Sequence, residues 1–221
     1  MATIANDPLR TGSPVDPLAV EPHLGADADA VALGPFSGRS LAWWGMVMAI
    51  LTEATLFGLL LFSYVYLRVR ADRWPPEGIS DPELPVTAFR SVLLIGSSIP
   101  AQLAERAFVH GNRRKALGYL VSTLVLAGIF LGFHFDELHT NWQEFRPSTN
   151  AYGSLFYTIT NLHALHLVIG MAFLVFCIVR ILQGKVRPGR HDALSVSVLY
   201  WHFVDAVWIA VFSILYLSVS L

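Results

Sequence analysis

Residues 152–182 read YGSLFYTITNLHALHLVIGMAFLVFCIVRIL, and Arg180 is the single Lys, Arg, Asp or Glu among them. A helix of about 20 residues already crosses the roughly 30 Å hydrocarbon core of a bilayer. The stretch lacks the short alternating pattern of a membrane β-barrel, and backbone groups in lipid must bond within their own segment. We therefore predict a transmembrane helix, long enough to tilt or to project beyond the lipid.

Four further apolar stretches flank this one, at residues 41–67, 86–108, 116–135 and 193–221. Each has at least about 20 residues, which is enough to cross a bilayer. Pro100 lies inside the second of them and is expected to kink its helix. The pattern predicts an all-α polytopic membrane domain with five transmembrane helices over residues 41–221.

The composition supports a membrane protein and excludes other classes. Of 221 residues, 54% are hydrophobic and 14% are charged, against about 25% charged in a typical soluble domain. The mean hydropathy of +0.54 excludes a disordered chain and argues against a water-soluble globule. The net charge of −1 gives no sign of a nucleic-acid partner. One cysteine, Cys177, excludes an intramolecular disulfide and a thiolate-ligated metal cluster.

Residues 1–40 differ from the rest of the chain. They hold several prolines, five acidic residues and two arginines, and no apolar run long enough to span a bilayer. They also lack the basic start of a secretory signal and the arginine-rich, acid-poor composition of a mitochondrial presequence. We expect a disordered or loosely bound tail, with a docking arm for a partner as the alternative.

Basic residues in the connections predict the orientation. They gather between the second and third stretches and between the fourth and fifth: Arg106, Arg113, Arg114, Lys115, Arg180, Lys185, Arg187 and Arg190. The connection between the third and fourth stretches has only Arg146. The positive-inside rule then places the N-terminus in the cytoplasm and the C-terminus outside. The bases that follow the first stretch oppose this orientation: Arg68, Arg70, Arg73 and, a few residues into the second stretch, Arg90.

Two carboxylic acids lie deep in apolar stretches, Glu53 in the first and Asp205 in the fifth. An Asp at mid-membrane costs about 2.5–3.5 kcal/mol on insertion scales. Each acid must therefore be protonated, hydrogen-bonded, or turned toward a partner or water. For Glu53, two hypotheses stay open: an acid that exchanges protons or contacts lipid, and a neutral carboxyl that joins helices.

The fifth stretch contains a polar face. His202 and Asp205 are three residues apart and share it, while Trp201, Asp205 and Trp208 form one stripe. A hydrogen bond between Asp205 and His202 would lower the cost of burying both. We predict a structural clasp within the bundle rather than direct chemistry.

The fourth stretch carries His163 and His166 one turn apart, a spacing that could ligate a metal. A di-iron membrane oxygenase would need clustered HxxHH motifs, and none occurs. We therefore predict helix-packing histidines and no metal. A further polar group closes the third stretch and is interpreted as an interfacial cap: His134, Asp136, Glu137 and His139.

Three segments together resemble subunit III of the haem–copper oxidases, especially of cytochrome c oxidase. They are YWHFVDAVWIAVFSILYL at 200–217, AYGSLFYTITNLHALHLVIG at 151–170 and TEATLFGLLLFSYVYLRVRADRWPP at 52–76. The resemblance spans roughly residues 41–221. The TE pair and the WPP turn are more similar to the cytochrome c oxidase branch than to the quinol oxidase branch.

The resemblance implies a non-catalytic subunit without haem or copper of its own. Haem a-type groups and copper would belong to partner subunits: electrons enter through subunit II, and subunit I reduces O2 to water with proton pumping. Subunit III packs directly beside subunit I, retains phospholipid and supports proton uptake and stable turnover. A small subunit IV and a respiratory supercomplex are further partners that the resemblance allows, in a bacterial plasma (inner) membrane.

The resemblance also assigns residues. Glu53 matches the buried carboxylate of the family, and Arg180 a position associated with lipid head groups. The remaining matches are the paired histidines and the closing motif, here His163, His166, Trp201, His202 and Asp205. No role is carried to Asp136 or Glu137, because the usual QxxE end of that helix is altered here.

Departures and alternatives stay open. The long mitochondrial form has seven helices, so we expect another subunit to supply the lipid-cleft wall of the two missing ones. His163-Ala164 also stands where the family has His-Gly. The alternatives are a subunit of a quinol oxidase or of a nitric-oxide-reductase-associated homologue, a small ion-coupled transporter using Glu53 and Asp205, and a di-iron oxygenase.

Overall fold

The computed structural model describes residues 40–77, 79, 84–186 and 191–218. These residues form helices and no strand: α2 (Leu41–Arg70), α3 (Leu84–Val109), α4 (Arg113–Glu144), α5 (Ala151–Leu182), α6 (Asp192–Phe212) and the π-helical turn η2 (Ser213–Leu217). Five helices are long and apolar enough to cross a membrane, with η2 continuing the last. The predicted all-α, five-helix architecture is confirmed. Of the predicted tail, residues 1–40, all but Ser40 lie outside the described residues, and Ser40 caps α2.

Polar side chains and glycines set the helix ends. Ser40, Asn112 and Asn150 accept hydrogen bonds from backbone N–H groups in the first turns of α2, α4 and α5. Gly111 and Gly184, with φ of +78° and +70°, lie in the turns that follow α3 and α5. Helices α2 and α4 extend past the predicted apolar stretches through polar residues, to Arg70 and Glu144, and α3 continues through Pro100 as one helix.

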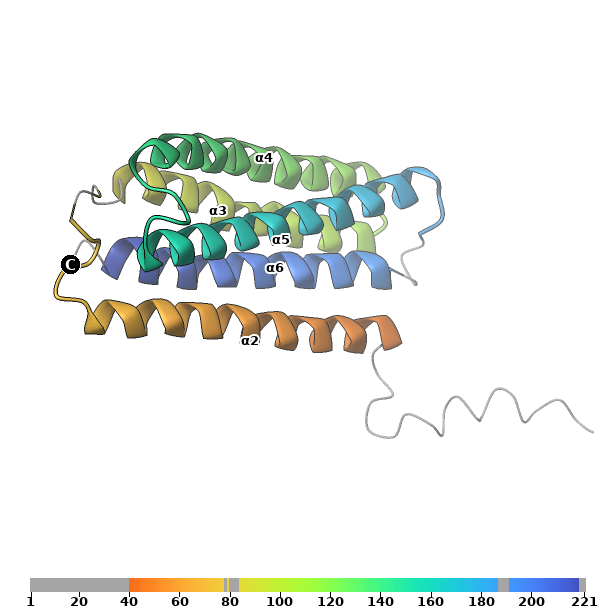
Figure 1. The fold of residues 1–221 in the computed structure, drawn as a ribbon. Coiled ribbons are helices and arrows are strands. Elements are labelled where there is room, and N and C mark those ends of the chain that lie inside the picture. The colour runs from red at the N-terminus through yellow and green to blue at the C-terminus, as the bar shows by residue number, and fades with distance from the viewer. Residues whose placement is uncertain (1–39, 78, 80–83, 187–190, 219–221) are drawn as a thin grey trace, which may run out of the picture. The chain divides into compact units, whose positions relative to one another are not determined.

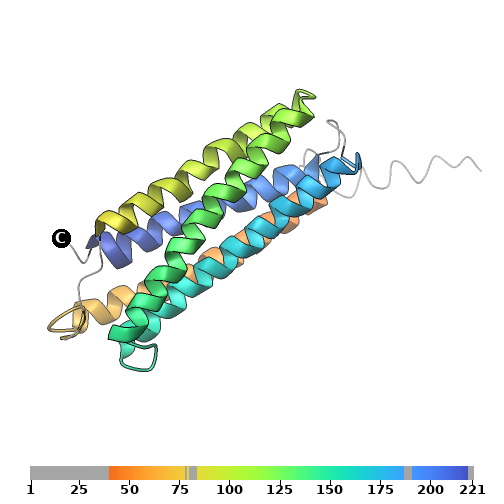
Figure 2. The ribbon, with the colours of Figure 1, turned by 90° about the horizontal axis from the view of Figure 1, so that it is seen from above.

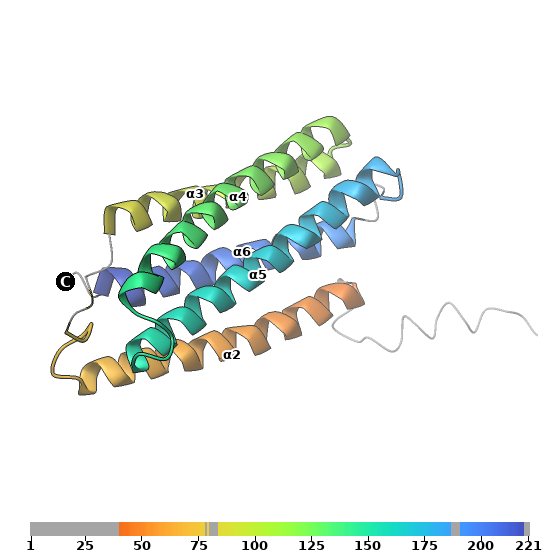
Figure 3. The same ribbon diagram turned by 45° about the horizontal axis from the view of Figure 1, so that its top comes forward.

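The helices of residues 40–218 run alongside one another (Figures 1 and 2). Helix α6 packs on α2, α3 and α5, and α5 packs also on α2 and α4. Helices α3 and α4 form a close pair, and α2 lies on the far side of α5 and α6 from that pair (Figure 3). Helices α5 and α6 therefore form the centre, and they carry most of the predicted site residues.

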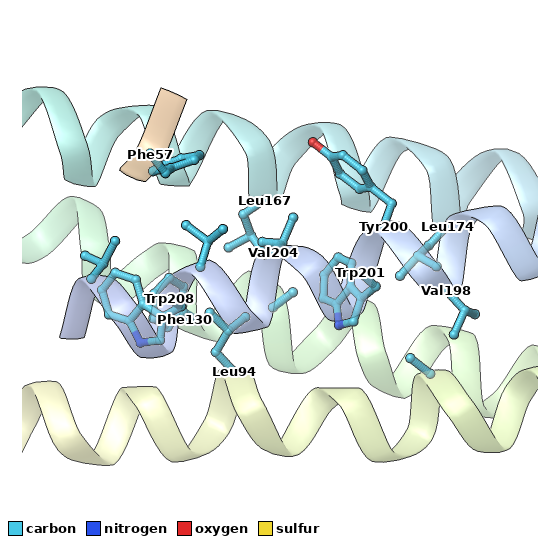
Figure 4. Packing of buried hydrophobic residues seen from close by; sticks show 14 of the residues in the cluster. Phe57, Leu94, Phe130, Leu167, Leu174, Val198, Tyr200, Trp201, Val204 and Trp208 are labelled. Atoms are coloured by element: carbon cyan, nitrogen blue, oxygen red, sulfur yellow. The ribbon is translucent and has the colours of Figure 1, made fainter. Parts of the chain in front are cut away.

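Two fully buried tryptophans, Trp201 and Trp208, join α6 to α3. The indole N–H of Trp201 donates to Ser97 Oγ at 3.0 Å, and that of Trp208 donates to Ser91 Oγ at 2.9 Å. Figure 4 shows both rings on the side of α6 that faces α3. A Cβ at Gly170 of α5 would lie 3.1 Å from the Trp201 ring, so glycine there lets α5 approach α6 closely.

Candidate functional site

Glu53 and His166 meet across the interface of α2 and α5. Glu53 Oε2 lies 3.0 Å from His166 Nε2, and 37% of the Glu53 side chain is exposed while the imidazole is almost buried. The adjacent hydroxyls of Thr52 and Thr55 each donate to a backbone carbonyl of α2. Phe57 packs edge-on against the imidazole, with ring centres 5.1 Å apart.

The hydrogen bond of His166 Nδ1 determines how many protons the Glu53–His166 pair holds. His166 Nδ1 lies 2.7 Å from the carbonyl oxygen of Leu162, which can only accept, so Nδ1 carries a hydrogen. The contact between Nε2 and the Glu53 carboxyl then needs one further proton. The pair is therefore net neutral, either as a carboxylic acid with an imidazole or as a carboxylate with an imidazolium.

A second polar cluster lies between α3 and α6. Asp205 is 4% exposed, and its Oδ2 accepts a hydrogen bond from Ser98 Oγ. The same Ser98 oxygen lies 2.9 Å from His202 Nδ1. Asp205 and His202 share a face of α6, as their spacing predicts, but they are joined through a serine of α3 rather than directly.

This cluster continues along α3 toward the α3–α4 turn. His202 Nε2 lies 3.1 Å from Gln102 Oε1, and Gln102 Nε2 donates to Glu105 at 3.4 Å. Ser195, in the first turn of α6, also donates to Glu105. A row of hydrogen-bonding side chains thus leads from Asp205 to the helix end at Glu105.

The structure also contains a buried ion pair that the sequence reasoning did not predict. Arg90 is 1% exposed, and its guanidinium lies 2.6 Å from Glu137 Oε2. Tyr216 Oη donates to the same carboxylate at 3.1 Å, and the Arg90 guanidinium lies over the rings of Tyr216 and Trp208. The π-helical turn η2 contains Tyr216 and alters the helical register there.

Two interpretations from the sequence change as a result. Arg90 serves packing inside the bundle, and Glu137 belongs to this ion pair, whereas Asp136 and His139 of the predicted cap are exposed. Arg90 itself was the sequence signal for this ion pair, because it is a charged residue seven positions into an apolar helix. Its partner could not be found, because the two residues lie on different helices.

The paired histidines of α5 face different neighbours. His166 contacts Glu53, while His163 packs against Trp208 with ring centres 4.8 Å apart. They do not converge on one point. Within the described part of the chain, no three His, Cys, Asp or Glu side chains are grouped so that they could hold a metal ion.

Arg180 lies in the last turn of α5, at one end of the bundle. Its guanidinium sits 5.8 Å from the Phe176 ring centre and is half-buried. Nearby, Arg113 of α4 donates to the carbonyl of Leu182 at 2.7 Å and so caps α5. Binding of a lipid phosphate by Arg180 stays a prediction.

Comparison with known proteins agrees with this architecture. The family model described as cytochrome c oxidase subunit III matches residues 35–220. Cytochrome c oxidase subunit 3 of Thermostichus vulcanus is 31% identical over 178 residues, covering 78% of this chain and 85% of the relative. The Gallus gallus protein of the same name is 28% identical over 179 residues (78% and 68%), and the Triticum aestivum one 30% over 181 (78% and 67%). The resemblance found in the sequence is confirmed: this chain belongs to the cytochrome c oxidase subunit III family.

Proposed function

We propose that this chain is the non-catalytic third subunit of a bacterial cytochrome c oxidase. In this proposal it packs directly on subunit I in the plasma membrane, within a complex that also contains subunit II. Haem a-type groups and copper reside in those partners. The chain retains phospholipid beside subunit I and supports the delivery of cytoplasmic protons. Membership of the subunit III family is the observation that carries the proposal.

The geometry of Glu53 supports a role at the surface of the bundle. Its carboxyl is partly open on α2 yet hydrogen-bonded to His166, so the shared proton can lie on either partner without leaving an isolated charge in lipid. A transporter would need Glu53 and Asp205 in one path. Their hydrogen-bond partners instead lie on different helices, α5 for Glu53 and α3 for Asp205, which favours the subunit function.

A cytoplasmic N-terminus is part of the proposal, because the basic α3–α4 turn and the basic end of α5 lie at the same end of the bundle as the start of α2 (Figure 1). The bases that oppose this orientation all have local partners: Arg68 bonds to Ser218, Arg70 lies over Tyr66, Arg73 pairs with Glu77, and Arg90 pairs with Glu137. These four bases therefore take part in contacts within the fold.

Affinity isolation of the full-length chain in mild detergent tests the proposal. We expect larger subunits and a haem a-type reduced-minus-oxidised spectrum to co-purify with it. When this chain is removed from the isolated complex, the haem absorbance should remain with the larger subunits. A folded, colourless chain that emerges without partners would contradict the proposal, as would a chain that retains bound iron after it is stripped.

A further inference from the structure

His134 of α4 and His163 of α5 are buried polar side chains without a hydrogen-bond partner. Each is 1% exposed, and neither ring nitrogen of either residue has a partner among the described residues. A neutral imidazole has one N–H donor and one acceptor nitrogen, so two donors and two acceptors are unpaired. Buried groups of this kind are rare in folded proteins unless protein atoms or ordered water satisfy them.

The two imidazoles lie around the same aromatic ring. Phe130 stacks on His134 with ring centres 6.5 Å apart and meets His163 edge-on at 6.2 Å. Trp208 closes the far side, with its ring centre 4.8 Å from those of both Phe130 and His163. The unpaired nitrogens therefore belong to one interior region, enclosed by α4, α5 and α6.

The buried ion pair borders this region. His134 Nδ1 lies 4.0 Å from Glu137 Oε2, which is too long for a direct hydrogen bond. The same carboxylate oxygen is held by Arg90, whose own Nε has no partner in the described residues. A gap of this length between two polar atoms is one that a single bridging water can span.

The chemistry of these groups selects the ligand. A metal cation is disfavoured, because the nearest carboxylate is already paired with the Arg90 guanidinium, which would repel a second positive charge. An anion would leave the acceptor nitrogens unsatisfied. Water can donate to an imidazole nitrogen or a carboxylate and accept from an imidazole N–H.

We propose that the bundle binds ordered water between His134, His163 and Glu137. At least one molecule bridges His134 Nδ1 and the carboxylate, and another satisfies His163. These waters extend the hydrogen bonds of the Arg90–Glu137 pair to α5, so that three helices are joined through one hydrated cluster. The inference rests on the contacts alone and is independent of the proposed oxidase function.

A map of the intact membrane complex at a resolution that shows water tests this directly. We expect density within about 3.2 Å of His134 Nδ1 and of Glu137, with a second feature at a His163 nitrogen. Ring nitrogens bonded directly to protein atoms would overturn the proposal. So would a stoichiometric metal, identified by anomalous scattering and elemental analysis.

Radiolytic hydroxyl labelling of the wild-type complex gives a second measurement that needs no variant. Trp208 and Trp201 are a matched pair, since both are fully buried on α6 and both donate to a serine of α3. Only Trp208 borders the proposed waters, so it should be oxidised several-fold faster. Equal rates, or a faster Trp201, would contradict the proposal.

Substitutions in α4 test which side chain holds the proposed water. His134→Leu should abolish the density near Glu137 and bring the Trp208 labelling rate down to that of Trp201. His139→Leu is the matched control, because His139 is exposed on the same helix and should change neither result. Unchanged density and labelling in His134→Leu would overturn the assignment. The wild-type measurements decide the question if that variant does not assemble.

Discussion

Glu53 Oε2 lies 3.0 Å from His166 Nε2, and His166 Nδ1 donates to the carbonyl of Leu162. The two side chains thus share one proton and carry no net charge between them. Because the pair is net neutral, the Glu53 carboxyl can be partly exposed in the membrane without the full free-energy cost of an isolated charge. This arrangement makes Glu53 a position where a substitution should affect function more than folding.

Glu53→Ala should leave assembly and the haem spectra of the complex intact. Loss of a hydrogen bond to this pair is worth about 1–1.4 kcal/mol, so affinity for a lipid held there should fall about fivefold to tenfold. Phospholipid per complex, measured by mass spectrometry, and the inactivation rate during turnover are the readouts. Glu53→Gln, which can still bond to His166, should retain more lipid than Glu53→Ala. Unchanged lipid content and inactivation in Glu53→Ala would contradict a role for this residue.

Asp205→Ala should weaken the bundle rather than lipid binding. The substitution leaves the Ser98 hydroxyl without its buried acceptor and removes the carboxyl end of the row that continues through Ser98 to His202, at a cost of about 1–3 kcal/mol. The yield of assembled complex and the midpoint of its thermal unfolding measure the effect. Asp205→Asn, which can still accept from Ser98, is the conservative control and should lie between the variant and wild type. A wild-type yield and midpoint in Asp205→Ala would exclude the clasp interpretation.

The buried Arg90–Glu137 pair should tolerate joint replacement better than single replacement. Arg90→Leu leaves the mostly buried Glu137 carboxylate without its charged partner; breaking a buried ion pair in this way typically costs about 3–5 kcal/mol. Adding Glu137→Leu removes that charge and should recover much of the lost stability in a double-mutant cycle. Arg73→Leu breaks an exposed ion pair with Glu77 and should change stability by less than about 1 kcal/mol. Additive effects of the two leucine substitutions would show that the pair is not energetically coupled.

Orientation can be measured with single cysteines, because the native Cys177 is buried and can be replaced by serine. Lys115→Cys lies at the α3–α4 end, and Arg146→Cys lies between α4 and α5. With a cytoplasmic N-terminus, a membrane-impermeant thiol reagent should label Arg146→Cys in intact cells. Labelling of Lys115→Cys should need permeabilised cells. The reverse pattern would invert the proposed topology.

The fold could be predicted from the sequence because hydropathy reports burial in lipid directly. Hydropathy located all five helices. It underestimated the length of α4, whose last residues up to Glu144 are polar but still helical. The site was predicted only in part. Glu53, Asp205 and the histidines are conspicuous in apolar segments, whereas Ser98 and Gln102 are unremarkable in sequence and gain importance only from the α3–α6 contact. Tyr216 reaches Glu137 from a π-helical turn, which hydropathy does not reveal.

Comparing the purified oxidase with and without this subunit tests its accessory role most directly. An accessory subunit predicts unchanged haem absorbance and a similar initial rate of O2 reduction after its removal. It also predicts less bound phospholipid and faster inactivation during sustained turnover, both restored when the chain is added back. Loss of haem absorbance with the chain, or identical inactivation with and without it, would contradict the account.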